Sequence, residues 1–285
     1  MTELKEALEA DLGVAVSAMR RVGGGDMAEA FMAELADGRR VFAKTHAAPP
    51  SGFFSREASD LRWLREPSVL PVPEVLAVSD GAPARLVLEW IESGGRGGSD
   101  ETAFGRNLAA LHQSGAEVFG REDGRTTGSQ ALPNDPCGTW VEFFADRRLH
   151  PLARMAADRN ALPARLVAAV EDIAGRLAEL GGPPEPPARL HGDLWAGNRM
   201  VDADGRSWLI DPASHGGHRE FDLAMMRLFG GFGDAAFHAY DEVFPLADGW
   251  AGRIVLHQLA PLVVHAIKFG GGYVGAVDDA VAGLR

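Results

Sequence analysis

The stretch that decides the fold is LHGDLWAGNRMVDADGRSWLIDPA, residues 190–213. Its second half contains two short apolar runs, 199–202 and 207–210, separated by Asp204-Gly205. Asp-Gly between two such runs predicts a tight turn, so the runs should pair as a β-hairpin. The hairpin would return the chain to the loop from which it departed.

Three oxygen-bearing side chains flank this hairpin: Asp193 and Asn198 precede it, and Asp211 follows it. Two carboxylates and one amide are hard ligands, which suit Mg²⁺ bound together with phosphate groups better than zinc. For each residue alone, a role in a turn or a helix cap is the simpler interpretation. The prediction of a magnesium and phosphate site therefore depends on what the rest of the chain supplies.

The composition indicates an acidic globular protein. The 285 residues contain 28 Lys+Arg against 40 Asp+Glu, a net charge of −12, and 46% are hydrophobic. This balance disfavours a general affinity for nucleic acid or for anionic membranes. An anionic small ligand is still compatible with it, because a local lysine and a metal ion can hold phosphates inside an acidic protein.

Cysteine usage and hydropathy bear on the cellular location. Cys137 is the single cysteine, which excludes an intrachain disulfide and a thiolate metal site. No run approaches the roughly 20 apolar residues of a membrane span, and residues 1–13 fit an amphipathic helix better than a signal peptide. We expect a cytoplasmic protein with no membrane or nucleic-acid partner, as a monomer or a weak dimer.

The first ninety residues have the pattern of an antiparallel sheet. Apolar and β-branched runs predict five strands, at 17–22, 29–36, 39–45, 74–78 and 84–91. Gly23-Gly24-Gly25 joins the first two, and Asp37-Gly38, which predicts a two-residue hairpin turn, joins the next two. Glycines at such a turn let backbone N–H groups approach phosphates, although most glycine-rich turns are only turns. Neither a P-loop nor a Rossmann fingerprint is present.

Lys44 shares one face of the third strand with Phe42. Such a lysine is usually exposed, but it can also point to a buried counter-charge. The next predicted helix, 53–66, places Glu57 in its first turns, where it could meet Lys44. A glycine-rich hairpin, a strand lysine and a helix glutamate together match the amino-terminal lobe of the protein-kinase-like fold.

In that fold, the end of the fifth strand presents backbone groups to the adenine, and here it reads Glu89-Trp90-Ile91. The residues assigned to ATP binding are Gly23, Gly24, Gly25, Lys44, Glu57, Glu89 and Ile91. The glycine-rich run 93–98 is the expected lobe boundary. We expect an N-terminal ATP-binding lobe, 1–92, and a C-terminal catalytic and substrate-binding lobe, 93–285.

The second lobe has helical periodicity, with a helix that ends near His112, a helix pair at 139–157 and a helix from Pro163. We interpret His112 as a structural residue. The long polar segment 115–136 carries no residue that can be assigned a role. The fold class is thus α+β, a protein-kinase-like bilobal fold: a five-stranded antiparallel sheet plus helix in the N-terminal lobe, and a mostly helical C-terminal lobe.

The segment 191–198 has the H-x-D-x-x-x-x-N spacing of a kinase catalytic loop. In that chemistry an Asp accepts or orients the proton of the substrate hydroxyl, which is the catalytic role of Asp193. Asn198 and Asp211 are then the magnesium ligands, and ATP and Mg²⁺ are the expected cofactors. Asp211-Pro212-Ala213 replaces Asp-Phe-Gly, so the phenylalanine switch of regulated protein kinases is missing.

The stretches HGDLWAGN, 191–198, and IDPASHGGHREFDLAMMRLFGGF, 210–232, resemble the fructosamine kinase (ketosamine kinase) family, a relative of aminoglycoside phosphotransferases and choline kinases. Trp195 and the late His265 point to the fructosamine branch. The resemblance covers nearly the whole chain. Some members carry a cysteine in the glycine-rich turn as a proposed redox switch; Gly25 stands in that place here, so such control is not expected.

The resemblance implies ATP-dependent phosphorylation of a sugar hydroxyl, typically the 3-hydroxyl, on a ketose attached to an amine. The phosphorylated adduct is then unstable and releases the amine, so the activity serves deglycation. The partner is a small-molecule or protein-bound ketosamine. Which ketosamine it is, a fructosamine, a ribulosamine or an erythrulosamine, stays open.

Two residues are candidate substrate contacts, Trp195 and His265. An indole beside the catalytic Asp offers an apolar face to a sugar, with a core position as the alternative. For His265, a buried structural role and a substrate-pocket role are equally compatible with the sequence. Near the start of the following helix, we interpret Glu220 as a structural charge and Asp222 as a brace for the catalytic loop.

Three other functions are compatible with parts of the pattern. The first is another small-molecule kinase of the aminoglycoside or choline phosphotransferase type, which tends to surround its cationic substrates with carboxylates. The second is a non-catalytic protein on the kinase fold, which would be expected to have lost a metal or phosphate residue. The third is a protein Ser/Thr kinase, which the missing Ala-Pro-Glu end after Asp211 disfavours.

Overall fold

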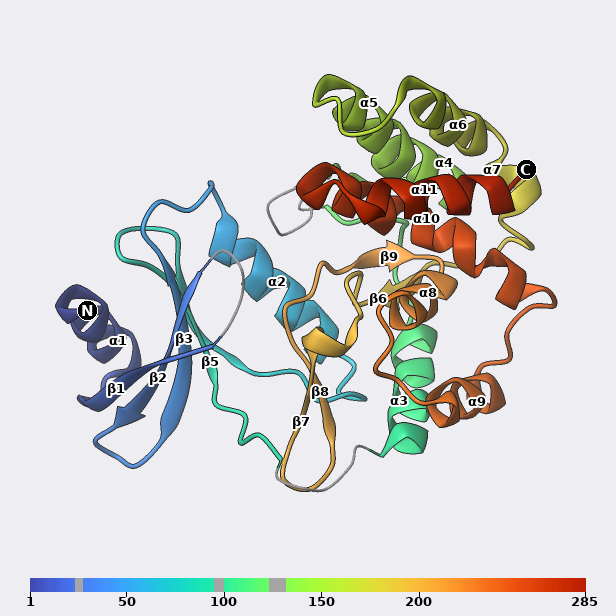
Figure 1. Ribbon diagram of the computed structural model, residues 1–285. Coiled ribbons are helices and arrows are strands. Elements are labelled where there is room, and N and C mark those ends of the chain that lie inside the picture. Colours follow the sequence, from blue (N-terminus) through green and yellow to red (C-terminus); the bar gives the residue numbers. More distant parts are fainter. Residues whose placement is uncertain (24–27, 95–99, 123–131) are drawn as a thin grey trace. The chain divides into compact units, whose positions relative to one another are not determined.

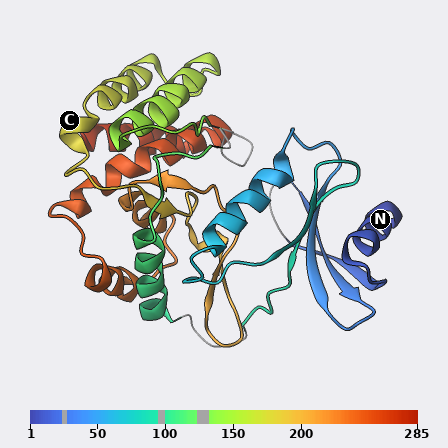
Figure 2. The ribbon, with the colours of Figure 1, turned by 180° about the vertical axis from the view of Figure 1, so that it is seen from behind.

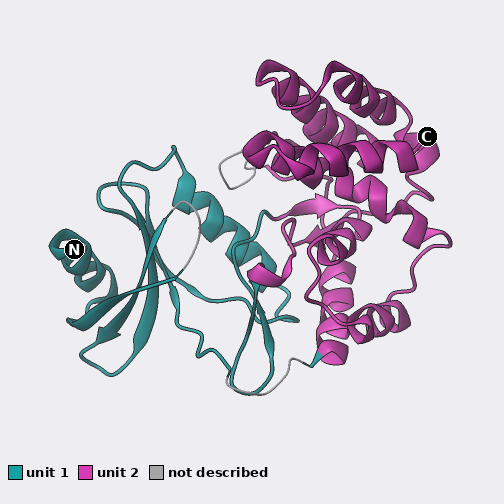
Figure 3. Cartoon of the chain, viewed as in Figure 1, with its two compact units in different colours: residues 1–100, 127–129, 199–213 teal, residues 101–126, 130–198, 214–285 magenta. Residues whose placement is uncertain are grey.

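The computed structural model describes residues 1–23, 28–94, 100–122 and 132–285. Gly24 and Gly25 of the expected ATP-binding set therefore lie outside the described residues. The chain divides into two compact units (Figure 3): the first holds residues 1–100 and 199–213, and the second holds 101–126, 130–198 and 214–285.

The first unit is built on a five-stranded antiparallel sheet of order β1-β2-β3-β5-β4 (Figure 1). The strands are β1 (Val16–Val22), β2 (Glu29–Leu35), β3 (Arg40–His46), β4 (Val75–Ser79) and β5 (Ala84–Glu89). The predicted sheet is thus confirmed. The unit also contains two helices, α1 (Thr2–Leu12) and α2 (Phe53–Arg65).

Alternation along β3 assigns the two faces of this sheet. Val41 and Ala43 are buried in a cluster with Leu4 and Leu8 of α1, so this face of the sheet carries α1. Phe42 and Lys44 therefore point to the opposite face, which carries α2. Figure 2 shows the two helices on opposite sides of the sheet.

Both Asp-Gly turns are three-residue loops. Leu35 N–H donates to the Arg39 carbonyl at 2.8 Å, so the Asp37-Gly38 loop is one residue longer than the two-residue turn predicted. Asp202 N–H donates to the Arg206 carbonyl at 3.0 Å, which confirms the tight turn predicted at Asp204-Gly205. In each, the glycine is the third loop residue and has positive φ, 89° at Gly38 and 82° at the corresponding Gly205. Three-residue hairpins place a left-handed residue there, which is why glycine fits.

The second of these loops closes the hairpin of β7 (Arg199–Val201) and β8 (Ser207–Leu209), which belongs to the first unit. Asp202 stabilises the loop, because its Oδ1 accepts hydrogen bonds from the N–H groups of Asp204 and Arg206, both at 3.0 Å. The hairpin predicted between 199 and 210 is confirmed.

The second unit is mostly helical, as predicted. Its helices are α3 (Glu101–Gln113), α4 (Trp140–Phe144), α5 (His150–Asp158), α6 (Ala164–Gly175), α7 (Leu177–Leu180), α8 (Glu220–Leu228), α9 (Asp234–Val243), α10 (Trp250–Phe269) and α11 (Gly272–Gly283). The π-helical turn η1 (Ala145–Leu149) joins α4 to α5. Among the described helices, none is both long enough and apolar enough to cross a membrane.

Two short strands frame the catalytic-loop segment in this unit. β6 (Ala188–Leu190) enters the loop, the 3₁₀ turn η2 (Ala196–Asn198) ends it, and β9 (His215–Gly217) pairs antiparallel with β6. The segment that follows β9 leads directly into α8. A large apolar core lies behind these strands, formed mainly by α4, α5, α6, α10 and α11.

Candidate active site

Lys44 is the centre of a buried charged cluster in the first unit. Its Nζ lies 2.6 Å from Oε1 of Glu57 on α2 and also contacts Oδ1 of Asp211. Lys44 is 6% exposed and Glu57 is 8% exposed, so the ion pair is largely shielded from solvent. The predicted meeting of the strand lysine and the helix glutamate is confirmed, and Asp211 joins them.

The pKa directions follow from this arrangement. Burial alone would lower the pKa of Lys44, but the carboxylates of Glu57 and Asp211 outweigh it and raise that pKa, so the ammonium form is retained. Burial and the Asp211 charge raise the pKa of Glu57, while Lys44 opposes the shift. Removing Lys44 would therefore leave the buried carboxylate of Glu57 next to the partly exposed carboxylate of Asp211 with no positive charge between them.

A cavity of about 270 Å³ opens beside Lys44 in the first unit. Gly23, Glu89 and Ile91 line it together with Lys44 and Asp211. The remaining wall is mainly apolar: Val22, Phe42, Pro73, Leu88, Trp90, Met200 and Ile210. A mainly apolar cavity with a few polar groups in its lining suits a heterocycle with charged substituents.

Two members of this wall, Met200 and Ile210, were missed by sequence reasoning. The 199–210 segment was recognised only as the hairpin that returns Asp211 to the catalytic loop, whereas its apolar side chains also line the cavity. Alternation along the predicted strands could have indicated an apolar face. It could not have indicated what that face covers.

The catalytic-loop segment lies in the second unit. Asn198 Nδ2 donates to the Asp193 carbonyl at 2.8 Å and to Asp193 Oδ2 at 3.0 Å. His191 Nδ1 accepts the Asp193 N–H at 3.2 Å, so the imidazole also supports the backbone of the loop. The amide of Asn198 donates through its nitrogen here, which keeps Oδ1 as its acceptor atom.

Asp222, at the start of α8, holds the entrance of the loop, as predicted. Its fully buried carboxylate accepts hydrogen bonds from the N–H groups of His191, at 2.7 Å, and Gly192, at 2.9 Å. Burial raises the pKa of Asp222, but the hydrogen bonds from the His112 ring and the Gly192 N–H outweigh it, and the net pKa is lowered. Asp222 therefore stays ionised and retains full acceptor strength for the loop.

Trp195 and His265 come together through a third ring. Trp195 is 40% exposed, and its indole lies 6.1 Å from the Phe229 ring, which lies 5.0 Å from the His265 imidazole. His265 is half-buried, shares a hydrogen bond between Nδ1 and the Pro261 carbonyl at 2.8 Å, and has a pKa lowered by that burial. Trp195, two residues after Asp193 in the chain, thus presents a partly exposed aromatic face beside two further rings.

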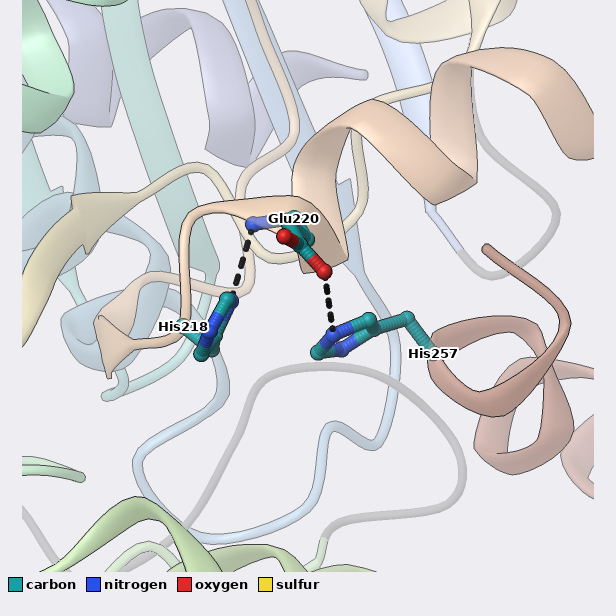
Figure 4. Close-up of side chains that lie close together, drawn as sticks. All are labelled: His218, Glu220 and His257. Carbon is teal, nitrogen blue, oxygen red and sulfur yellow. Dashed lines mark hydrogen bonds and ion pairs between the residues drawn. The ribbon is translucent and has the colours of Figure 1, made fainter. Parts of the chain in front are cut away.

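A second buried polar cluster in this unit joins His218, Glu220 and His257 (Figure 4). These residue types bind metals, but both Glu220 oxygens accept hydrogen bonds from Arg253, at 2.9 and 2.5 Å. A cation bound there would lie beside a guanidinium group, at a high electrostatic cost in a buried place. We therefore interpret the cluster as a structural ion pair with neutral histidines.

The pKa values within this cluster support that interpretation. Burial is the main cause that lowers the pKa of His218 to about 3, and it also lowers that of His257. The close contact of His257 Nε2, 3.5 Å from Glu220 Oε2, and the hydrogen bonds from Arg253 lower the pKa of Glu220 to about 2 against the effect of burial. The cluster thus consists of an ionised glutamate, its arginine partner and two uncharged imidazoles, and Glu220 has the structural role inferred from the sequence.

The fold and these residues define a class: a phosphotransferase of the protein-kinase-like fold. A choline kinase of Streptococcus pneumoniae matches 99% of this chain and 97% of its own with a TM-score of 0.63, and at 19% identity this likeness concerns the fold alone. The chain belongs to the fructosamine kinase family, whose model matches residues 1–284.

Individual relatives agree with this membership. A protein of Synechocystis assigned as a ketoamine kinase is 36% identical over 261 residues, which cover 89% of this chain and 85% of its own. A crystal structure from Thermobifida fusca, assigned as a fructosamine-3-kinase, has a TM-score of 0.93 at 40% identity and covers 100% of this chain and 99% of its own. The family resemblance inferred from the sequence is confirmed, and it makes the chain a kinase of the sugar-amine class.

Proposed function

We propose that this protein transfers the γ-phosphoryl group of ATP to a ketosamine, with the 3-hydroxyl of the sugar as acceptor. The products are ADP and the ketosamine phosphate. The family match over residues 1–284, together with Asp193 and Asn198 joined in one loop, carries this proposal. The acceptor position comes from the fructosamine-3-kinase assignment of the relative from Thermobifida fusca.

In this proposal Asp193 is the catalytic residue. The sugar hydroxyl attacks the γ-phosphorus atom while it is hydrogen-bonded to the Asp193 carboxylate, which takes up the hydroxyl proton as the new O–P bond forms. The bond between the γ-phosphorus atom and the bridging oxygen breaks, and ADP leaves. Asn198 holds the carboxylate of Asp193 by its Nδ2 hydrogen bond, so the acceptor oxygen is oriented before the substrate binds.

The cavity beside Lys44 is the proposed nucleotide site. Its apolar walls take the adenine, with the backbone at Glu89 and Ile91 at one edge, and Lys44 binds the phosphates while Glu57 keeps it in place. Gly23 to Gly25 would contribute backbone N–H groups to the phosphates. The ammonium group of Lys44, retained by its raised pKa, is the charge that this task needs.

Asn198 and Asp211 are the proposed magnesium ligands, and their amide and carboxylate oxygens are the donors that Mg²⁺ prefers. Bound there, Mg²⁺ neutralises phosphate charge that develops during transfer. The contact between Lys44 and Asp211 supports this assignment, because it shows that the Asp211 carboxylate reaches the cavity lining. Asp211 has φ of 51°, an uncommon backbone conformation that clusters at functional sites.

The proposed biological role is deglycation. A phosphate ester on the sugar makes the ketosamine unstable, so the amine is released in its original form. Small-molecule and protein-bound ketosamines are both included as substrates. Trp195 and His265 are proposed to contact the sugar part that all such substrates share.

The test is an ATP-consumption assay against the lysine adducts of fructose, ribulose and erythrulose, with kanamycin and choline as alternative acceptors. We expect ATP consumption with at least one ketosamine, and phosphorus–proton correlation NMR should place the new phosphate on the 3-oxygen. Turnover of kanamycin or choline alone would overturn the proposal and favour the other small-molecule kinases. Phosphate on a different oxygen would refute the regiochemistry only.

A further inference from the structure

A buried chain of hydrogen bonds continues from Asp222 away from the catalytic loop. His112, near the end of α3, has Nε2 3.2 Å from Asp222 Oδ2 and Nδ1 2.7 Å from the hydroxyl oxygen of Tyr240 on α9. The exposed fractions are 1% for His112 and 0% for both Asp222 and Tyr240. These side chains come from three helices, α3, α8 and α9, and none of these helices is adjacent in sequence to the catalytic loop.

The direction of each hydrogen bond follows from the chemistry of the partners. The Asp222 carboxylate only accepts, so His112 Nε2 carries a proton. A neutral imidazole then accepts at Nδ1, and the Tyr240 hydroxyl must donate to it. Burial raises the pKa of Tyr240, which therefore keeps its proton. The positive charge of Arg219 opposes this rise in the pKa of Tyr240 without reversing it.

Arg219 is itself held at several points, which gives the chain a fixed far end. Its Nη2 lies 2.8 Å from Glu185 Oε1, and its Nη1 donates to the Phe244 carbonyl at 2.7 Å. Its guanidinium carbon lies 3.7 Å from the centroid of the Phe244 ring. A low-dielectric interior strengthens such a fully satisfied network and penalises any member that loses its partner.

The near end of the chain controls the backbone that precedes the catalytic carboxylate. Asp222 accepts from three groups, the two loop N–H groups and His112 Nε2. Gly192, one residue before Asp193, has φ of 80°, a left-handed conformation that its hydrogen bond to Asp222 helps to retain. If His112 no longer donated, the carboxylate would be free to turn and the loop would follow it.

We propose that His112 and Tyr240 are positioning residues of the phosphoryl transfer: through Asp222 they set the place of the loop that presents Asp193. The proposal rests on the proposed function for its kinetic consequences. Its structural part, the coupling of a tyrosine hydroxyl on α9 to the loop amides, stands independently of the substrate.

The side chains allow a graded test at His112. A glutamine amide can replace Nε2 and still donate to Asp222, but it does not replace Nδ1; leucine replaces neither. Tyr240→Phe removes the hydroxyl alone and leaves the ring, so Nδ1 of His112 loses its hydrogen-bond donor and the imidazole is no longer held from the side of α9. The variants to prepare are Tyr240→Phe, His112→Gln and His112→Leu, with His150→Leu, a surface histidine beside Glu171, as the matched control.

Two readouts separate positioning from general stability. The first is hydrogen–deuterium exchange of a peptide that contains the His191 and Gly192 amides, measured on the full chain without substrate. The second is the split between kcat and KM for ATP. We expect faster exchange of this peptide in Tyr240→Phe and His112→Leu, and kcat lower by on the order of 10–100-fold in His112→Leu, because small displacements of a catalytic group have effects of this size. KM for ATP should stay within about twofold, and His112→Gln should recover part of kcat.

The results that would overturn the inference are equally definite. The inference is refuted if His112→Leu and Tyr240→Phe both behave like the His150→Leu control. In that case the loop amides keep their protection from exchange and kcat keeps the control value. It is also refuted by a loss of activity that only follows the melting temperature and that His112→Gln does not relieve. If the wild-type protein phosphorylates no ketosamine, the proposed function fails, while the exchange data still decide whether α9 is coupled to the loop.

Discussion

The side-chain amide of Asn198 donates a hydrogen bond to Oδ2 of Asp193 at 3.0 Å, so the candidate metal ligand also orients the candidate catalytic carboxylate. The same nitrogen donates to the Asp193 carbonyl at 2.8 Å, which ties both ends of the loop together. Asn198 reaches Asp193 from the end of the 3₁₀ turn η2, which closes the loop. A substitution at Asp193 that keeps this hydrogen bond therefore tests proton transfer without changing the conformation of the loop.

Asp193→Asn should remove catalysis and leave the loop in place. The new amide oxygen still accepts the hydrogen bond of Asn198, but an amide does not take up the hydroxyl proton. We expect kcat to fall by roughly 10²–10⁴-fold, as for the loss of a general base, with the dissociation constant of ATP changed by less than about threefold. Asp204→Asn, in the exposed hairpin turn, is the control. Turnover near the wild-type level in Asp193→Asn would contradict the assignment of Asp193 as the catalytic base.

Glu57→Gln should weaken the hold on Lys44 without leaving an unpaired buried charge. The 2.6 Å ion pair becomes a hydrogen bond from the Lys44 ammonium group to an uncharged amide, and Lys44 shifts towards Asp211. We expect kcat/KM for ATP to fall on the order of tenfold and KM for the ketosamine to stay unchanged. Glu6→Gln on the exposed face of α1 controls for the loss of one negative charge. Equal kinetics in both variants would contradict a role of Glu57 in nucleotide binding.

Trp195→Leu should affect the sugar substrate and not the nucleotide. The exposed indole ring contributes an apolar face that leucine reproduces only in part, and this is the observation that supports a substrate contact. We expect KM for the ketosamine to rise about tenfold, as for a lost contact worth roughly 1.4 kcal/mol, with KM for ATP unchanged. Trp250→Leu, at the start of α10, is the matched control. A selective rise in KM for ATP would instead indicate that the ring supports the nucleotide site.

The buried histidines predict a specific loss of stability in mild acid. The pKa of His218 is lowered to about 3 and that of His257 is also lowered, whereas an unfolded histidine titrates near 6.5. Between these values the unfolded state binds more protons than the folded state. The contribution of the two histidines to the free energy of unfolding is therefore fully present above about pH 6.5 and is lost as the pH falls towards 3. The slope is at most about 1.4 kcal/mol per pH unit for each histidine.

His257→Phe tests this slope, because Trp140 and Phe144 already surround the position with aromatic rings. Urea unfolding at several pH values between 7 and 5 should show a flatter dependence in this variant than in the wild type. Glu220, whose pKa is lowered to about 2, adds its own loss only below about pH 4.5 and does not interfere. An unchanged slope in His257→Phe, with His150→Asn as the surface control, would contradict the neutral buried state.

The sequence by itself determined the parts whose signal is local. The strand lysine and the helix glutamate are only 13 residues apart, so the order of strand and helix was enough to predict that they could meet. The spacing from His191 to Asn198 is contained in one loop, and the hairpin after it is fixed by alternation and by a turn glycine. Where the local signal was coarse, the prediction was coarse as well: Asp-Gly indicated the turns but not their three-residue length.

Only the tertiary structure decided the contacts between distant segments. His112 lies 110 residues from Asp222 and 128 from Tyr240, and nothing in a helical pattern states which buried polar groups will face each other. The same holds for the contacts of the Phe229 ring with Trp195 and His265, and for the apolar hairpin face that lines the cavity beside Lys44. The physical reason is that a buried polar or aromatic group is placed by the packing of whole elements, and that packing depends on all their side chains together.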